Sequence, residues 1–380
     1  MLPAGWAVTV FSQFMKSLYS MEDGNGPQSF SFLKHELPVR ICNIMKEINL
    51  LPEKLLQMPS ARTVKGWYQQ TLEDLLEFED SDDKCINLNT KFTEQLITIR
   101  NRHSNVVETM AQAVLEMRES YEYDQHEENN IQYFLNRFYI SRISIRMLIN
   151  QHTLLFGSAP KTHPRHIGSI DPNTDVVSVV ADAYDSAKFL CDQYYLASPD
   201  VEIKTINSKD DSNNIHIVYV PSHLYHILFE LFKNSMRAVM EHKGPSATDF
   251  PKIKVLITKG QQDLTIRMSD EGGGIPRTQI DQLFNYMYTT APTHLNLVSL
   301  PFHLWLYAKY FHGDLTLTSM EGYGTDALIY LKVLSSEANE LLPIYNHAVN
   351  RHYRANLTVS DWSSPMGGFR SLSLNSSRHF

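Results

Sequence analysis

Three polar side chains that recur every four residues form the first candidate for chemistry. His226, Glu230 and Asn234 lie in the segment "SHLYHILFELFKNSMRAVMEH", whose apolar positions repeat as in a helix, so the spacing brings the three onto one face. An amide oxygen is a suitable Mg²⁺ ligand when water and phosphate complete the octahedron, so Asn234 can hold a metal. Glu230 can accept a proton from a nucleophile, with His226 orienting it or tuning its pKa. The alternative is a solvated helix face, because such stripes are common.

A second candidate follows an alternating strand, in the stretch "MSDEGGGIP". Asp270 is followed by Gly272, Gly273 and Gly274, so its carboxylate can point into a pocket whose floor is bare backbone. A planar heterocycle with an exocyclic amine, such as adenine, needs a hydrogen-bond acceptor at its edge and close backbone approach at its face. The alternative is a glycine-rich hairpin turn.

A third motif is "EGYGTD", in which Gly322 and Gly324 precede Thr325. The hydroxyl of Thr325 can reach the ligand that Asp270 would bind. A turn between two strands explains the two glycines equally well.

The first 160 residues or so carry four long segments with helical periodicity, which predicts an antiparallel bundle. One of these segments, residues 89–124, is predicted as a single helix that starts at an Asn89 cap. The last segment ends at Gly157, and residues 158–172 form a linker rich in turn formers.

Beyond this linker the pattern mixes helices with hairpin strands. Helices are expected over residues 175–196 and 222–242, the second capped by Ser222, and strands over residues 215–221, 251–270 with a turn at Gly260, and 313–334. This order predicts an α+β class, a helical bundle followed by an α/β sandwich with helices on one face of a mostly antiparallel sheet. We expect the parts to be residues 1–28, 29–160, 165–335 and a tail from 336 to 380.

The composition excludes several classes of protein. Hydrophobic residues make up 43% of the chain and charged residues 20%, which is typical of a globular protein with a substantial core. The 42 acidic and 34 basic residues give a net charge of -8, so no global basic field attracts nucleic acid or an anionic membrane, and no apolar run is long enough to span a bilayer. Cys42, Cys85 and Cys191 are widely spaced, which indicates a reducing compartment without a disulfide framework.

Taken together, the motifs are more specific than any one of them. "ELFKNSMRA", "SDEGGGIP" and "EGYGTD" resemble the nucleotide site of the GHKL ATPase and kinase superfamily. "HELPVRICNIMKEI", "IRNRHSNVVETMAQAV", "VPSHLYHILFELFKNSMRAV" and "QLFNYMYTTAP" resemble the mitochondrial pyruvate dehydrogenase kinases, with the branched-chain 2-oxoacid dehydrogenase kinase as a close relative. The resemblance runs from about Phe32 to Trp362.

The resemblance implies a protein serine kinase that uses ATP and Mg²⁺. Glu230 would be the general base, His226 its partner and Asn234 the Mg²⁺ ligand. The nucleotide would be bound by Asp270 at the adenine amine, by Gly272 and Gly274 that shape the pocket, and by Thr325 that lines it. Apart from the resemblance, Arg237 or Lys233 is the candidate to hold the phosphates if the chain binds ATP without a glycine-rich lid.

The resemblance also implies partners and regulation. The substrate would be serines on the E1α subunit of the pyruvate dehydrogenase complex, with docking of the bundle on the lipoyl domain of the E2 core in the mitochondrial matrix. Arg100, His103 and Arg142 match positions that line an allosteric pyruvate site in the family. Asp361 and Trp362 match the C-terminal pair through which one subunit of a homodimer engages the other.

The sequence departs from the family pattern in two places. Between Gly274 and Gly313 it has no glycine, whereas the family has there a second box of the type "GFGYGLP" that forms an ATP lid. The segment before Phe32 also lacks a recognisable counterpart of the family's first helix. Two hypotheses therefore remain, an active E1α kinase that inhibits the complex and a regulatory member without a functional lid. A histidine kinase with His103 as phosphoacceptor is disfavoured, because no acid follows that histidine directly and no receiver domain follows.

Overall fold

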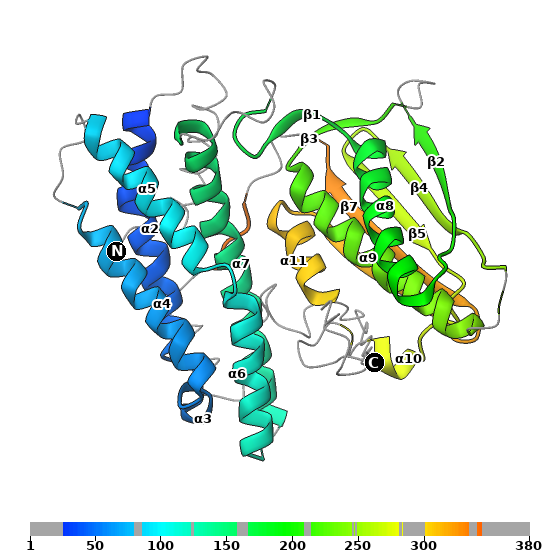
Figure 1. The fold of residues 1–380 in the computed structure, drawn as a ribbon, viewed down its shortest axis with the longest axis horizontal. Helices are drawn as coiled ribbons and strands as arrows, with labels where there is room; N and C mark the ends of the chain where they lie inside the picture. The colour runs from blue at the N-terminus through cyan, green and yellow to red at the C-terminus, as the bar shows by residue number, and fades with distance from the viewer. Residues whose placement is uncertain are drawn as a thin grey trace, which may run out of the picture.

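Helices alone build the first half of the fold (Figure 1). The computed structural model describes residues 26–79, 86–122, 125–157, 166–208, 214–244, 247, 249–280, 283, 301–333 and 340–343. Within these residues the bundle contains α2 (Gly26–Ile48), α3 (Glu53–Leu56), α4 (Pro59–Leu76), α5 (Ile86–Arg102), α6 (Val106–Ser120) and α7 (Gln125–Phe156). Helix α2 packs against α4 and α7, α4 against α6, and α5 against α7.

The prediction of one helix over residues 89–124 is wrong. The segment forms α5, which begins at Ile86 rather than at an Asn89 cap, and α6, which begins at Val106. The carbonyls freed at the break are bound from a distant helix, since Nη2 of Arg142 on α7 donates to the carbonyl of His103 at 3.0 Å and to that of Ser104 at 3.4 Å. Tertiary hydrogen bonding therefore stabilises a turn that the local periodicity does not reveal.

Fully buried aromatic rings form the centre of the bundle. Phe30 and Phe92 meet edge to face with centroids 4.8 Å apart, and Tyr68 meets Phe138 at 5.7 Å. Such geometry stabilises aromatic pairs beyond the area that they bury. None of the described helices is both long and apolar enough to cross a membrane.

The second half of the fold combines helices with strands. In chain order it contains β1 (Asp171–Asp175), α8 (Val176–Tyr195), β2 (Val201–Asn207), β3 (His216–Tyr219), α9 (Pro221–Lys243), β4 (Ile253–Lys259), β5 (Asp263–Ser269), α10 (Arg277–Ile280), α11 (Pro301–Tyr310), β6 (Asp314–Met320) and β7 (Gly324–Lys332). Both predicted helices and both predicted hairpins are present, the first with its turn at Gly260, whereas β1 and β2 had no counterpart in the sequence analysis.

Five strands form one mixed sheet in the order β2-β4-β5-β7-β6, in which only β2 and β4 pair in parallel. Alternate residues of the central strands are buried, for example Ile257 on β4 and Ile266 on β5, so one face of the sheet is apolar. Helices α8 and α9 pack on each other and lie across one face of the sheet (Figure 1). The α+β class is therefore confirmed.

Helix α9, which carries the first candidate residues, starts one residue earlier than predicted. Pro221 is its first residue and Val220 its N-cap, with no side-chain capping bond, so the predicted Ser222 cap is wrong. Proline is favoured at this position because its missing N–H would have no partner inside the helix. Leu228, Leu231 and Phe232 are buried as expected.

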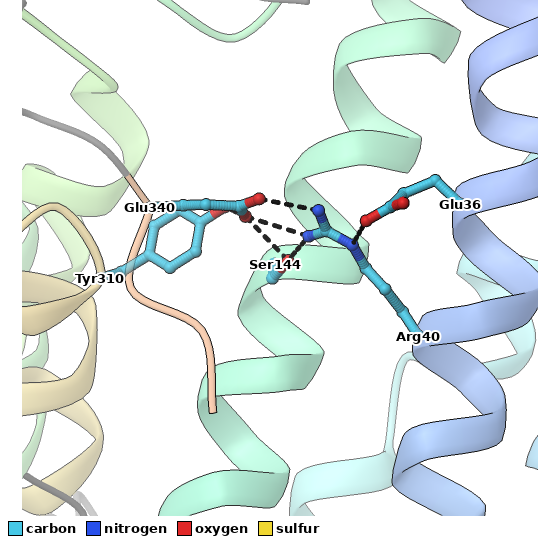
Figure 2. Close-up of polar contacts among 5 residues, drawn as sticks. All are labelled: Glu36, Arg40, Ser144, Tyr310 and Glu340. Carbon is cyan, nitrogen blue, oxygen red and sulfur yellow. Dashed lines mark hydrogen bonds and ion pairs between the residues drawn. The ribbon is translucent and has the colours of Figure 1, made fainter. Parts of the chain in front are cut away.

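A buried polar network joins the two halves (Figure 2). Arg40 on α2 donates to Glu340 at 2.7 and 3.0 Å, and the Glu340 carboxylate also accepts from Ser144 on α7 at 3.0 Å and from Tyr310 on α11 at 2.9 Å. Arg40 further donates to Ser144 and, through Nε, to Glu36 at 2.8 Å. One carboxylate from the last described segment thus bridges the bundle and the α/β part.

Candidate active site

The carboxylate of Asp270 lies at the end of β5, where the sheet register fixes its surroundings. Ser269 on β5 pairs with Asp326 on β7, and the next residue, Asp270, donates from its backbone N–H to the carbonyl of Thr325 at 3.0 Å. Its Oδ1 accepts from the backbone N–H groups of Gly272 at 3.0 Å and Thr325 at 3.3 Å. Its Oδ2 accepts from the Ser235 hydroxyl on α9 at 3.0 Å. The sequence analysis placed Asp270 and Thr325 at one ligand, and the structure brings them together.

Asp270 is only 8% exposed, and this burial raises its pKa. The hydrogen bonds from Gly272, Ser235 and Thr325 oppose that rise, whereas the charge of Asp326 adds to it. Three donors around one buried carboxylate therefore favour the ionised form, which accepts hydrogen bonds only.

The glycines after Asp270 are required by the packing of the chain against itself. A Cβ on Gly272 would lie 2.6 Å from the Cβ of Ala238 on α9. Gly274 has a φ of +68°, and a Cβ there would lie 2.0 Å from the carbonyl oxygen of Met320 at the end of β6. The glycines thus allow α9 and the end of β6 to pack directly against the backbone of this loop. This packing holds the loop next to the Asp270 carboxylate.

Glu230 on α9 forms an ion pair with Lys233, one turn along the helix. Nζ of Lys233 donates a hydrogen bond to Oε1 at 2.8 Å. It also lies 2.8 Å from Oε2, with which it forms an ion pair without the angles of a hydrogen bond. Buried Oε2 accepts no hydrogen bond from any described residue. A carboxylate oxygen that accepts no hydrogen bond from the described residues can accept a proton, as a general base does.

His226 lies one turn before Glu230, with its ring centroid 5.0 Å from that of Tyr307 on α11. Burial lowers the pKa of His226, the charge of Glu230 opposes this shift, and the charge of Lys233 adds to it. The two predicted partners are therefore within electrostatic reach, while the direct contact of Glu230 is with Lys233.

Asn234 and Arg237 line a pocket between α8 and α9, together with Lys233. The α8 side contributes Ala187, Leu190, Cys191, Tyr194 and Tyr195. The pocket has a volume of about 160 Å³. This is below the roughly 300–1,000 Å³ that is usual for pockets that enclose a whole ligand. The helices alone therefore enclose a site of the size of one ring or one phosphate group.

Ser235 and Ser319 belong to the site but were missed by the sequence analysis. Ser319 on β6 donates to the carbonyl of Gly324, accepts from the backbone N–H of Ile275 at 2.8 Å, and lies 2.9 Å from the Thr325 hydroxyl. A signal existed for Ser235, because it follows Leu231 and Phe232 at helical spacing on the buried face of α9. A buried hydroxyl needs a hydrogen-bond partner, so a serine at such a position points to a polar neighbour.

A second cluster of candidate residues lies inside the bundle. His103 is buried, its Nε2 lies 2.9 Å from the Thr71 hydroxyl, and its ring is 4.7 Å from that of Tyr68. Burial lowers the pKa of His103 to about 4, and the charges of Arg142, Arg102 and Arg146 add to that shift.

Arg142 is close to His103, and its buried Nε makes no hydrogen bond to any described residue. Burial also lowers the pKa of Arg146, and the charges of Arg142 and Arg100 contribute. The structure therefore brings His103 and Arg142 together, while Arg100 acts by its charge on Arg146, which the sequence analysis had not singled out.

Other predictions lie outside the described residues. These are the start of the chain up to residue 25, the dimer residues Asp361 and Trp362, and, within the glycine-poor stretch between Gly274 and Gly313, residues 281, 282 and 284–300.

Comparisons with known proteins match both halves of the chain. Residues 10–171 match the family model described as "Mitochondrial branched-chain alpha-ketoacid dehydrogenase kinase". Residues 219–335 match the model described as "Histidine kinase-, DNA gyrase B-, and HSP90-like ATPase". The first match begins within the segment that the sequence analysis regarded as divergent.

Curated relatives are similar over most of the chain. The [pyruvate dehydrogenase (acetyl-transferring)] kinase isozyme 1, mitochondrial, of Mus musculus is 53% identical over 349 residues, covering 89% of this chain and 80% of the relative. The Drosophila melanogaster enzyme with the same designation, without an isozyme number, is 55% identical over 351 residues, covering 89% and 85%. Isozyme 4 of Rattus norvegicus is 48% identical over 384 residues, covering 96% and 93%.

Proposed function

The chain belongs to the family of mitochondrial pyruvate dehydrogenase kinases, and on that premise we propose that it phosphorylates pyruvate dehydrogenase on serines of the E1α subunit and thereby inhibits it. It is a protein kinase with a GHKL-type domain that uses ATP. The observation that carries the proposal is that helix α9 carries both Glu230, whose Oε2 accepts no hydrogen bond from the described residues, and Ser235, which donates to Asp270.

Catalysis of phosphoryl transfer requires mainly positioning and charge stabilisation. Glu230 would accept the proton of the substrate serine at Oε2, because Oε1 already accepts a hydrogen bond from Lys233 and Oε2 accepts none from the described residues. His226 would tune this base, and Lys233 and Arg237 would face the phosphates. Asp270 would accept the adenine amine, with Thr325 beside it and Gly272 and Gly274 shaping the loop.

The amide oxygen of Asn234 suits Mg²⁺, which takes few protein oxygens when phosphate and water supply the rest. Among the described residues no group of three or more His, Cys, Asp or Glu side chains could hold a metal alone, which agrees with an ion that is bound mainly by the nucleotide. Mg²⁺ would neutralise phosphate charge at Asn234.

The second hypothesis, a non-catalytic regulatory member, gains no support. Glu230, Asn234 and Asp270 are all present on the elements that a nucleotide site needs, and the curated relatives that match are named as kinases.

Regulation and partners extend the proposal. The bundle, about residues 29–160, would bind the lipoyl domain of the E2 core in the mitochondrial matrix, and residues 165–335 would bind ATP. Pyruvate would bind beside Arg100, His103 and Arg142, because the unbonded Nε of Arg142 can donate to a carboxylate. Asp361 and Trp362 in the tail would join two subunits of a homodimer.

The test is phosphate transfer to E1α by Glu230→Gln. We expect the rate to fall roughly 10² to 10⁴-fold with nearly unchanged ADP affinity, which is the usual effect of losing a general base. The matched control is Glu202→Gln, which removes an exposed ion pair with Lys204 on β2 and should leave the rate unchanged. Transfer at the parent rate by Glu230→Gln would place the base elsewhere.

A further inference from the structure

Ser235 is a polar residue on the buried face of α9. The residue is 8% exposed, and its neighbours on that face include Leu231, Phe232 and Val239. The hydroxyl donates to Oδ2 of Asp270 at 3.0 Å, and its other short contact is with Sδ of Met268 at 3.8 Å. The Ser235 hydroxyl therefore lies among apolar side chains and donates its hydrogen bond to one carboxylate oxygen, Oδ2 of Asp270.

The two oxygens of Asp270 differ in their remaining capacity. Each carboxylate oxygen accepts about two hydrogen bonds. Oδ1 already accepts from two backbone N–H groups, those of Gly272 and Thr325, whereas Oδ2 accepts from Ser235. The acceptor position that remains for a ligand is therefore on Oδ2, the oxygen that Ser235 holds.

We propose that Ser235 is a positioning residue for purine selection, which holds Oδ2 of Asp270 so that its remaining acceptor position faces the exocyclic amine of adenine. This inference rests on the proposed nucleotide-binding role of Asp270. It assigns to α9 a second contribution to the site, made from the face opposite to that of a catalytic base. Purines with an oxygen in place of the amine would be rejected, because an ionised carboxylate has no proton to donate.

Loss of the Ser235 hydroxyl should change the pH dependence of nucleotide binding through the pKa of Asp270. Burial raises the pKa of Asp270 and the Ser235 bond opposes it, so loss of the hydroxyl raises the pKa further. The protonated acid would present a donor where the amine needs an acceptor. The other charged groups around the loop are Asp326 on β7, Glu271, which pairs with Lys254 of β4 at 3.1 Å, and His242 of α9 beside Gly273.

The experiment measures calorimetric affinities for ADP and for inosine 5′-diphosphate between pH 5 and 8. Wild type is compared with Ser235→Ala, with Ser235→Thr, which restores a hydroxyl, and with Ser222→Ala, an exposed serine of the same helix. We expect Ser235→Ala to bind ADP about tenfold more weakly, since hydrogen bonds to charged groups are among the stronger ones. Its affinity for inosine 5′-diphosphate should change little, so the ratio of the two falls.

The pH at which ADP affinity declines should move upward in Ser235→Ala and return toward the wild-type value in Ser235→Thr. Unchanged ADP affinity and an unchanged pH profile in Ser235→Ala would overturn the role of Ser235 while leaving the nucleotide site intact. A uniform loss for both nucleotides with a lowered melting temperature would also overturn it, as a structural effect. No ADP binding by wild type would overturn the nucleotide role of Asp270 as well.

Discussion

Replacing Arg40 by methionine tests the buried network that joins the two halves of the protein (Figure 2). The side chain of Glu340 is fully buried and that of Arg40 is 7% exposed. Burial alone would lower the pKa of Arg40, but the charge and hydrogen bonds of Glu340, together with the charges of Glu36 and Tyr310, raise it. The attraction of these neighbours together therefore exceeds the desolvation of the guanidinium.

The magnitude follows from what the substitution leaves behind. Methionine fills most of the volume of the arginine stem, while Glu340 keeps only the hydroxyls of Ser144 and Tyr310 as donors. Removing one partner of a buried ion pair costs about 3–5 kcal/mol, because the other charge stays buried without compensation. The double variant Arg40→Met with Glu340→Gln removes that charge and should be less destabilised than Arg40→Met alone.

Amide hydrogen exchange measures this locally. The Leu341 N–H donates to the carbonyl of Tyr310 at 2.8 Å, so exchange in residues 340–343 reports release of the segment. We expect exchange roughly 10² to 10⁴-fold faster in Arg40→Met, which is the stated cost converted at about 1.36 kcal/mol per factor of ten.

The control is Lys254→Met, which breaks an exposed ion pair with Glu271 at 3.1 Å and should change stability by less than about 1 kcal/mol. Wild-type protection of residues 340–343 in Arg40→Met would refute the argument. It would mean that the hydroxyls and the backbone bond hold the segment without the charge pair.

Three further outcomes are expected. Asn234→Ala should abolish the part of nucleotide affinity that depends on Mg²⁺, and equal gains from Mg²⁺ in wild type and variant, measured by calorimetry, would contradict the metal assignment. Burial lowers the pKa of His152 to about 4, whereas the pKa in the unfolded chain is about 6.5. The folded state therefore has its full stability above pH 6.5, where the imidazole is neutral in both states. About 2 kcal/mol of the free energy of unfolding is lost by pH 5, because the unfolded chain binds a proton that the folded chain does not. Denaturation midpoints of His152→Gln should therefore fall less between pH 7.5 and 5 than those of wild type or of the exposed-site control His35→Asn. Gly274→Ala should destabilise by about 2 kcal/mol or more, through its positive φ and the clash with β6. Gly322→Ala, with a φ of +85° but open space around it, should cost only about 1 kcal/mol; equal midpoints for the two variants would remove the clash argument.

Local patterns predicted the elements that carry the site. The apolar repeat of α9 and the alternation of β4 and β5 are short-range signals, so Glu230, Asn234 and Asp270 could be placed on their elements. Register then brought Asp270 beside Thr325, as the motifs suggested.

What the sequence could not predict depends on partners far away in the chain. The two backbone carbonyls freed at the break after α5 accept hydrogen bonds from Arg142, which lies 39 and 38 residues further along the chain. Strand β2 begins with the alternation Val-Glu-Ile-Lys, which the sequence analysis missed, but its parallel partner β4 lies about 50 residues later and cannot be read from that local pattern. The glycine run after Asp270 suggested a ligand at the backbone, whereas the neighbours that demand glycine are α9 and β6.

The Arg40–Glu340 contact also sets an order of events during synthesis. Its two residues lie 300 positions apart, so at about 5–20 residues per second the ribosome needs roughly 15 to 60 s after Arg40 before Glu340 exists. Throughout that interval a folded bundle would hold the Arg40 guanidinium with Glu36 and Ser144 only. Docking of the bundle on the α/β part is therefore completed only after residue 340 has been made, and a chain released before that residue would leave the Arg40 guanidinium with Glu36 as its charged partner at that junction.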